Sequence, residues 1–407
     1  MKHRVVVTGM GIQSPLGDNA ETFFSRLCAG ESGIRAHPEL AVTVQVGWVD
    51  FSPSDYFSKI QLRQLDRVSQ LAIVAATTAA QDAGLNTTQA LGETAGVYFG
   101  TSAGGAESTE HAYAKFFGVG GESKKLLTVP AAMVHAPASQ VALRLGVQGE
   151  CQTYSTACSS ASVAIGEAFR RIQGGHMQIA IAGGADCMLT PGVLDSWADM
   201  RVLCSDPLNS TGSGCRPFSA NRSGFAIGEG AAVFVLETLA SAEARGAQPL
   251  VELVGYGVSN DARHITKPHP AGQALAMRKA LADANLSPHH IGYINAHGTA
   301  TQAGDLIETQ SIKAVFGEYA RQIPISSTKS AHGHLMGATG AVELVATIMA
   351  LQQQIVPPTT HCNEPDPECD LDYVPLVARQ VIGLDYAQSN SFAFGGNNSV
   401  LIARRWS

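Results

Sequence analysis

Short apolar runs alternate along the chain with longer segments in which apolar residues recur at every third or fourth position. The runs at 4–11, 95–105, 178–186 and 231–237 predict β-strands. An alternation of strands and helices of this kind is typical of an α/β fold. The helices are predicted by the periodic segments at 68–84 and 273–284, the first closing on Gly84 and the second near Asn285.

An internal repeat adds a much longer period to this alternation. Residues 79–101 and 280–299 share one order of features: the end of a helix, a short polar loop, a strand and a final Gly-Thr pair. Upstream of these stretches, 4–14 is matched by 251–260. We therefore expect two degenerate copies of one α/β unit, packed as a pair of halves.

Length and charge narrow the classes of protein that the chain can represent. Its 407 residues accommodate two halves, which we place at 1–250 and 251–407. The formal net charge of -7 argues against a nucleic-acid partner and against an anionic membrane surface. No apolar run reaches the roughly 18 residues that a membrane span requires.

The cysteines indicate neither a metal site nor a disulfide framework. All eight are scattered singly, and no C-x-x-C pair occurs. The chain begins with a predicted strand and shows no secretory signal, so a reducing cytoplasm is the expected compartment.

One cysteine, Cys158 in "STACSSA", stands where an extended segment turns into a helix. Unpaired N–H groups and the helix dipole at such a position favour a thiolate, the nucleophilic form of cysteine. A buried cysteine is more often inert packing, so a catalytic role requires a partner elsewhere in the chain. The helix is predicted from apolar residues at helical spacing, which continue up to the glycines at 174–175: Ala161, Val163, Ala164, Ile165, Ala168, Phe169 and Ile172.

Two later segments supply candidate partners for this thiol. "NAHGTATQAGDLIE" ends a strand with His297, and "ISSTKSAHGHLMGATGAVE" carries Lys329, His332 and His334 ahead of a helix that begins near Met336. A histidine at a strand end is most often structural, and H-G-H could in principle hold a metal. The metal-binding interpretation is weak, because no carboxylate or cysteine stands at ligand spacing beside H-G-H. A thiol with imidazoles that donate hydrogen bonds to a developing oxyanion fits better.

Five sequence blocks resemble, in order, the motifs of the β-ketoacyl-acyl carrier protein synthases. The blocks are "STACSSA", "CRPFSANRSGFAIGEGAAVFVLE", "NAHGTATQAGDLIE", "STKSAHGHLMGATGAVE" and "SNSFAFGGNNSVLI". The likeness covers essentially the whole chain and is closest to the elongating type II enzymes. It also extends to the ketosynthase of rhizobial nodulation-factor lipids. It implies the thiolase fold, in which two βαβαβαββ halves pack as five layers, αβαβα.

The resemblance implies a decarboxylative Claisen condensation. An acyl group passes from the phosphopantetheine of an acyl carrier protein to Cys158, and malonyl-carrier protein then loses CO2 and attacks the thioester. His297 and His334 match the histidines that serve decarboxylation, and Lys329 matches the active-site lysine. The backbone N–H groups of Cys158 and Phe394 would hold the oxyanion. No tightly bound cofactor and no metal are expected.

The resemblance also assigns residues around this centre. Phe394 and Phe392 match the aromatic gate. Thr299, Thr301 and Thr266 match positions near the malonyl carboxylate, and the supporting acids are Glu308, Glu343 and Asp305. Ala103 stands where elongating enzymes often carry a larger aliphatic residue at the wall of the acyl pocket, which suggests room for a longer chain. Contacts with the carrier protein fall on Lys59, Arg63 and Arg216.

Other functions remain open at this stage. The family is dimeric, and the partner subunit is either an identical chain or a chain-length factor. A non-catalytic chain-length factor would itself lack the cysteine, which is intact here. A Cys-His acyl hydrolase would share the thiol but would need neither Lys329 nor the "FAFGG" loop.

Overall fold

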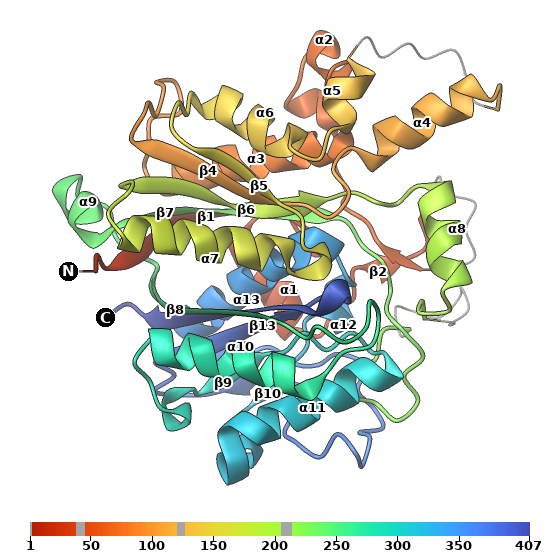
Figure 1. The fold of residues 1–407 in the computed structure, drawn as a ribbon, viewed down its shortest axis with the longest axis vertical. Helices are drawn as coiled ribbons and strands as arrows, with labels where there is room; N and C mark the ends of the chain where they lie inside the picture. The colour runs from red at the N-terminus through yellow and green to blue at the C-terminus, as the bar shows by residue number, and fades with distance from the viewer. Residues whose placement is uncertain (1, 38–44, 120–126, 205–213) are drawn as a thin grey trace.

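A single ten-stranded mixed sheet runs through the computed structural model, which describes residues 2–37, 45–119, 127–204 and 214–407 (Figure 1). Its strand order is β10-β9-β13-β14-β8-β1-β7-β6-β4-β5. The strands are β1 (Val5–Gln13), β4 (Ala95–Gly100), β5 (Cys151–Tyr154), β6 (Ile179–Asp186), β7 (Gly230–Thr238), β8 (Val251–Asn260), β9 (Tyr293–Asn295), β10 (Ile325–Ser326), β13 (Tyr386–Phe392) and β14 (Asn397–Arg405). Two small two-stranded sheets pair β2 (Ile34–Arg35) with β3 (Val46–Gly47), and β11 (Ile355–Val356) with β12 (Arg379–Gln380).

The sheet consists of two halves with the same strand order. The first half runs β1-β7-β6-β4-β5 and the second β8-β14-β13-β9-β10, with the same sequence of two antiparallel and two parallel pairings. Strands β1 and β8 join the halves, with Val5 opposite Leu253. The predicted duplication is therefore confirmed. The exact division at residue 250 stays a prediction, although β8 begins at Val251.

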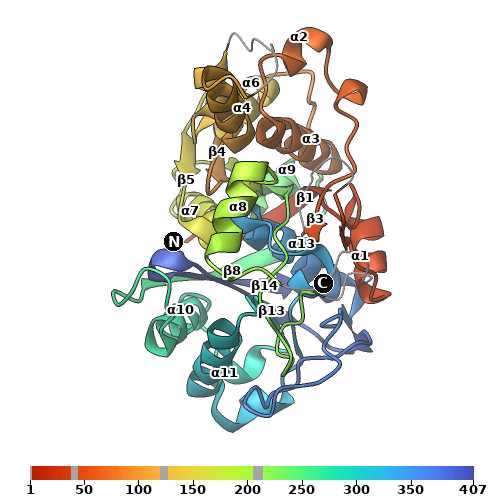
Figure 2. The same ribbon diagram turned by 90° about the vertical axis from the view of Figure 1, so that its right-hand side faces the viewer.

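Helices form the remaining three layers (Figures 1 and 2). In Figure 1, α3 and α6 cover the outer face of the first half-sheet, α7 and α13 lie between the two half-sheets, and α10 and α11 cover the outer face of the second. This is the predicted five-layer arrangement. The helices are α1 (Ala20–Cys28), α2 (Lys59–Leu62), α3 (Arg67–Asp82), α4 (Ala106–Phe116), α5 (Thr128–Ala132), α6 (Ala136–Leu145), α7 (Ser160–Gln173), α8 (Pro191–Asp199), α9 (Leu239–Ala244), α10 (Pro270–Asp283), α11 (Gln302–Phe316), α12 (Lys329–His332) and α13 (Thr339–Gln353).

The repeated glycines of β1 and β8 let the outer helices approach their strands closely. A Cβ added at Gly11 would lie 2.1 Å from the carbonyl oxygen of Ala75 in α3, and one added at Gly257 would lie 2.0 Å from that of Ala276 in α10. Two chain segments with little sequence identity thus use glycine for the same close helix–strand contact.

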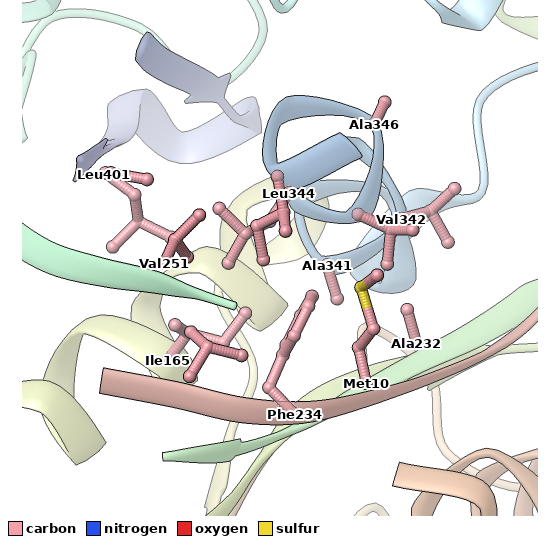
Figure 3. Close-up of a cluster of buried hydrophobic side chains, with 14 of the residues drawn as sticks. Met10, Ile165, Ala232, Phe234, Val251, Ala341, Val342, Leu344, Ala346 and Leu401 are labelled. Carbon is pink, nitrogen blue, oxygen red and sulfur yellow. The ribbon is translucent and has the colours of Figure 1, made fainter. Parts of the chain in front are cut away.

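The central helices are buried by both half-sheets (Figure 3). Phe234 and Met10 from the first half-sheet, Ile165 from α7, Leu344 from α13 and Leu401 from the second half-sheet belong to one cluster, and none of them exposes more than 8% of its surface. Helix α13 is buried along Thr339–Leu351, so even Thr339, Glu343 and Thr347, which share one face of the helix, lie inside the protein. This packing brings the starts of α7 and α13 together, where Cys158 and His334 lie.

The strands and helices predicted from the apolar pattern all occur. Gly84 adopts φ 70° just after α3, and Asn285 adopts φ 54° just after α10, as expected for residues that close helices. Among the described residues, no helix is both long enough and apolar enough to cross a membrane.

Candidate active site

A strained turn presents Cys158 between β5 and α7. Ala157, a non-glycine residue, adopts φ 52°, and Ala157–Ser159 form a short 3-10 turn that leads into α7. The Ser160 hydroxyl accepts the backbone N–H of Thr156 at 2.9 Å and donates to the Ala157 carbonyl at 2.6 Å, so both sides of the turn are fixed. Positive φ at a residue other than glycine is costly and is retained mainly at functional sites.

Three side chains from three distant segments converge at this turn. The sulfur of Cys158 and one ring nitrogen each of His297 and His334 all lie within 4.8 Å of one another. His297 follows β9, and His334 precedes α13. Each of the three residues is at most 8% exposed, and all three line one cavity, which we call the active-site cavity. The pairing of the thiol with these two histidines, expected from sequence, is present in the structure.

The hydrogen bonds of His334 determine its tautomer. Its Nδ1 accepts the backbone N–H of Met336 at 3.2 Å and lies 2.9 Å from the Thr339 hydroxyl, which must therefore donate. The proton of the neutral ring is consequently on Nε2, which is buried and has no hydrogen-bond partner among the described residues. His334 thus holds an unused N–H donor beside Cys158.

Buried charged groups hold the backbone of His297 on both sides. Lys329 Nζ donates to the His297 carbonyl at 2.5 Å and to Glu343 Oε1 at 2.5 Å. The Glu308 carboxylate accepts the N–H groups of His297 at 2.9 Å and of Gly298 at 2.7 Å. These contacts fix the position of the imidazole without using its ring nitrogens.

Both imidazoles are neutral in this environment. Burial lowers the pKa of His297 and of His334 well below the usual 6.5, and the Lys329 charge lowers both further. A neutral imidazole beside a cavity can donate one hydrogen bond without carrying a charge of its own.

Burial opposes the thiolate that the helix start was expected to favour at Cys158. Burial raises the pKa of the Cys158 thiol to about 11, although the Lys329 charge and the backbone N–H groups of Phe394 and Cys158 act in the opposite direction. The start of α7 does not offset the loss of water around the sulfur. Those two N–H groups nevertheless face the sulfur, where the resemblance expects the oxyanion to be held.

The two histidines of the H-G-H stretch have different surroundings. His332 Nδ1 contacts the Gly333 carbonyl at 2.7 Å and Nε2 contacts the Thr328 hydroxyl at 3.0 Å, so both nitrogens are engaged inside the protein. His332 does not line the active-site cavity, whereas His334 does. Only His334 is therefore available to a substrate.

Six of the other expected site residues also line the active-site cavity. Thr299 and Thr301 lie with their hydroxyl oxygens 2.9 Å apart, and Thr266 belongs to an exposed loop at the same cavity. Asp305 lies behind it and accepts the N–H groups of Phe218 and Ala300. Burial raises the pKa of Asp305 to about 7. The lining residues among those expected are Thr266, Thr299, Thr301, Glu308, Phe392 and Phe394.

Besides Lys329, Glu343 and Asp305, four expected residues do not line the active-site cavity. Ala103 lines a second cavity beside α8. Lys59 and Arg63 are exposed at α2, in the upper part of Figure 1, and Arg216 is half-buried ahead of Phe218. Their assignment to carrier-protein contacts stays a prediction.

Two aromatic residues of the site were not anticipated from sequence. Trp197 in α8 stacks on Phe394, with ring centroids 6.1 Å apart, and meets Phe225 edge-on at 5.6 Å. Phe225 in turn meets His334 edge-on at 5.3 Å. Phe225 lies within the block "CRPFSANRSGFAIGEGAAVFVLE", which is the signal that could have indicated it, whereas Trp197 lies in none of the five blocks.

The cysteine and two histidines could in principle ligate a metal ion. His334 has only Nε2 free for a ligand bond, and the ammonium group of Lys329 lies close enough to shift the pKa of all three side chains. A positive charge at this distance opposes a divalent cation. The residues fit a thiol with hydrogen-bond donors better than a metal centre.

Comparison with known proteins places this site in a family. The model of the Beta-ketoacyl synthase, N-terminal domain, matches residues 2–242, and that of the Beta-ketoacyl synthase, C-terminal domain, matches residues 250–363. The chain is 39% identical over 410 residues to 3-oxoacyl-[acyl-carrier-protein] synthase 2 of Staphylococcus aureus (strain COL), covering 99% of this chain and 98% of the relative. It is 42% identical over 405 residues to nodulation protein E of Rhizobium meliloti (strain 1021), covering 98% and 99%.

Solved structures agree with these relatives. The ishigamide ketosynthase/chain length factor superposes with a TM-score of 0.92 at 32% identity, and a beta-ketoacyl synthase from Burkholderia phymatum STM815 with 0.91 at 36% identity. Each comparison covers 100% of both chains. With both domain models matched in order and full-length relatives above 30% identity, the chain belongs to the β-ketoacyl synthase family.

Proposed function

We propose that this chain is a β-ketoacyl-acyl carrier protein synthase that lengthens a carrier-bound acyl chain by two carbons. The observation that carries the proposal is the buried convergence of Cys158, His297 and His334, with an unused N–H donor on His334. The relatives named 3-oxoacyl-[acyl-carrier-protein] synthase 2 support the substrate class.

In the first half-reaction, the Cys158 sulfur attacks the thioester carbonyl of the acyl-carrier protein. The bond between the acyl carbon and the carrier sulfur breaks, and the phosphopantetheine thiol takes up the proton that Cys158 gives up. The backbone N–H groups of Cys158 and Phe394 face the sulfur and would hold the oxyanion of the tetrahedral intermediate.

In the second half-reaction, malonyl-carrier protein occupies the side of the cavity lined by His297, His334 and Thr299. The bond to the carboxylate breaks, CO2 leaves, and the electron pair remains on the carbon next to the thioester. The N–H donors of the neutral imidazoles stabilise the enolate oxygen. That carbon attacks the acyl-Cys158 carbonyl, and the C–S bond breaks to release the lengthened chain and the Cys158 thiolate, which takes a proton from water to regenerate the thiol.

The proposed chemistry requires no tightly bound cofactor, because the substrates arrive on the phosphopantetheine of the carrier and the acid–base groups are side chains of this chain. A reducing compartment, the cytoplasm, suits the eight free thiols of the protein.

Intact-protein mass spectrometry after mixing with acyl-carrier proteins tests the acyl-enzyme. We expect a gain of one acyl group in the wild type and none in Cys158→Ala. Cys151→Ala is the matched control, because Cys151 is exposed and would acquire any non-specific acylation. A gain that persists in Cys158→Ala would contradict the proposal.

Addition of malonyl-carrier protein to the acyl-enzyme then separates condensation from hydrolysis. A product two carbons longer supports a synthase, and free fatty acid without a lengthened product supports a Cys-His acyl hydrolase.

A ketosynthase subunit that works only with a chain-length factor is a second candidate. Two solved structures favour this candidate. The chain superposes on a ketosynthase/chain length factor with a TM-score of 0.92. It superposes on a type II PKS ketosynthase, solved in complex with its acyl-carrier protein, with a TM-score of 0.90. Acylation of the purified chain alone supports a synthase that needs no second kind of subunit. Acylation only after addition of a co-expressed second subunit supports the heterodimer.

A further inference from the structure

A single cation stands at the open end of the active-site cavity. Among the described residues that line this cavity, Lys267 is the only lysine or arginine. It lies exposed on the loop between β8 and α10, whereas Cys158, which lines the same cavity, is 8% exposed. The cavity therefore leads from a positive charge at the surface to a buried sulfur.

The two carboxylates that line the cavity are already paired with other donors. Asp261 accepts the Asn398 side-chain amide at 2.8 Å and the His269 backbone N–H at 2.9 Å. Glu308 accepts two backbone N–H groups at 2.9 and 2.7 Å. Neither carboxylate forms an ion pair with Lys267, so the ammonium group can attract an anion that enters the cavity from outside.

The backbone around Lys267 is fixed before any ligand arrives. Nδ1 of His264 accepts the backbone N–H groups of Thr266 at 3.1 Å and of Lys267 at 3.3 Å, so the imidazole closes a tight turn. The carbonyl of Ile265, inside this turn, accepts the N–H of Gly395 at 2.7 Å. Because the turn is held from both sides, binding of an anion at Lys267 requires little ordering of the backbone.

The chemistry of the proposed substrate identifies the anion. Each acyl group arrives on a phosphopantetheine arm, which has a thioester at its inner end and a phosphodiester at its outer end. The thioester has to reach Cys158, so the phosphodiester remains at the exposed end of the cavity, where Lys267 lies. A malonyl carboxylate stands next to the thioester and so belongs at the buried end. An ammonium group is a common ligand of phosphate in proteins.

We propose that Lys267 is a specificity-determining residue that binds the phosphate of the phosphopantetheine arm. The contact holds the arm at its outer end while the thioester lies at Cys158, and it disfavours thioesters that carry no phosphate. This role rests on the proposed function and adds the charged group by which the site recognises its substrate. It is separate from the carrier-protein contacts predicted at Lys59, Arg63 and Arg216.

Three acyl donors distinguish the phosphate from the carrier protein. They bear the same acyl group on the carrier protein, on free phosphopantetheine and on pantetheine, which lacks the phosphate. Intact-protein mass follows acylation of Cys158 at increasing donor concentration and gives a half-saturating concentration and a maximal rate. In the wild type, the phosphopantetheine thioester should half-saturate at a concentration about three- to tenfold lower than the pantetheine thioester. This factor lies between an exposed ion pair and a hydrogen bond to a charged group.

Substitution of Lys267 should abolish this preference. Lys267→Met should raise the half-saturating concentration about three- to tenfold for both donors that carry a phosphate. It should leave the pantetheine thioester and all maximal rates unchanged. Lys267→Arg keeps the charge and should restore most of the preference. Arg263→Met is the matched control, because Arg263 is exposed on the same loop and does not line the cavity.

The outcomes separate the phosphate contact from the proposed function. If no donor acylates Cys158, the proposed function fails, and the role of Lys267 fails with it. If acylation occurs but Lys267→Met affects all three donors equally or none of them, the phosphate contact is overturned while the synthase assignment stands. An effect confined to the carrier protein would also overturn it and would assign Lys267 to acidic side chains of the carrier.

Discussion

At the scale of single residues, the site is governed by burial more than by position along a helix. Cys158 stands at a helix start, yet loss of water raises its pKa to about 11. The same burial keeps His297 and His334 neutral, so that each ring can donate one hydrogen bond without carrying a charge. Lys329 and Glu343 form an ion pair with both side chains 0% exposed, and they hold the His297 carbonyl in place.

The protonation of Cys158 predicts a steep pH dependence of its reactivity. Because its pKa is raised to about 11, the thiolate fraction and the rate of iodoacetamide alkylation should rise by about tenfold per pH unit through neutral pH. The Lys329 charge lowers this pKa, so a Lys329→Met, Glu343→Leu double variant, which removes both members of this ion pair, should react more slowly at pH 8. The exposed Lys313→Met serves as control. A wild-type rate that levels off below pH 9 would refute the expectation.

The different surroundings of His334 and His332 predict different defects. His334→Asn removes a donor that faces the cavity and should lower the condensation rate by about 10²–10⁴-fold, the usual range for a general acid–base or donor side chain. His332→Asn, two residues away, should lower the melting temperature and leave most of the rate per folded molecule. Steady-state assays with thermal unfolding of both variants check this. Equal catalytic defects at equal folded fractions would argue against the distinction.

At the scale of elements, close helix–strand contacts position the ends of the strands that carry the site. Gly11 in β1 and Gly257 in β8 hold α3 and α10 at the same short distance in each half. The strand ends and the starts of α7 and α13 then meet in the middle of the molecule, and the site forms there.

Alanine at either of these glycines should destabilise the fold. Its Cβ would lie about 2 Å from a helix carbonyl oxygen. We expect each of Gly11→Ala and Gly257→Ala to lower the free energy of unfolding by about 1–3 kcal/mol, as overpacking of a core does. Urea denaturation measures the loss, and Ala282→Ser on the exposed side of α10 should change it by less than about 0.5 kcal/mol. A large loss in one half and none in the other would contradict the equivalence of the two contacts.

At the scale of the whole molecule, a buried arginine joins the two halves beside the site. The guanidinium of Arg222, 3% exposed, donates to the carbonyls of Ser219, Thr301 and Gln302 at 2.9, 3.2 and 3.0 Å. It also pairs with Asp366 at 2.5 Å and lies 3.7 Å from Asp305. Arg222, which belongs to the first half, therefore holds the turn of the second half that carries Thr299 and Thr301.

Removal of this arginine should cost far more than removal of an exposed one. Arg222→Met leaves Asp305 buried without its cation and should lower the free energy of unfolding by about 3–5 kcal/mol. Arg379→Met removes an exposed partner of Asp372 and should cost about 0–1 kcal/mol. Chemical denaturation of both variants measures the difference. Similar losses would show that the buried cluster contributes no more than a surface ion pair.

The sequence by itself determined the elements, the duplication and the identity of the reactive side chains. Apolar periodicity, the glycines and the motif blocks are features of short stretches of sequence. The elements, the duplication and the reactive side chains can therefore be predicted from the chain alone. Cys158, His297, His334 and Lys329 were predicted in this way, and the structure places them together.

The tertiary structure alone decided the protonation of Cys158, the engagement of both ring nitrogens of His332, the place of Ala103 and the stacking of Trp197 on Phe394. Each of these depends on side chains that are far apart in sequence. The pKa of Cys158 depends on water excluded by all the packed segments around it, and Ala103 is separated from the Cys158 cavity by the position of α8. Burial and the distances between remote segments are set only when the two halves pack together. No local pattern in the sequence encodes which atoms will then face one another.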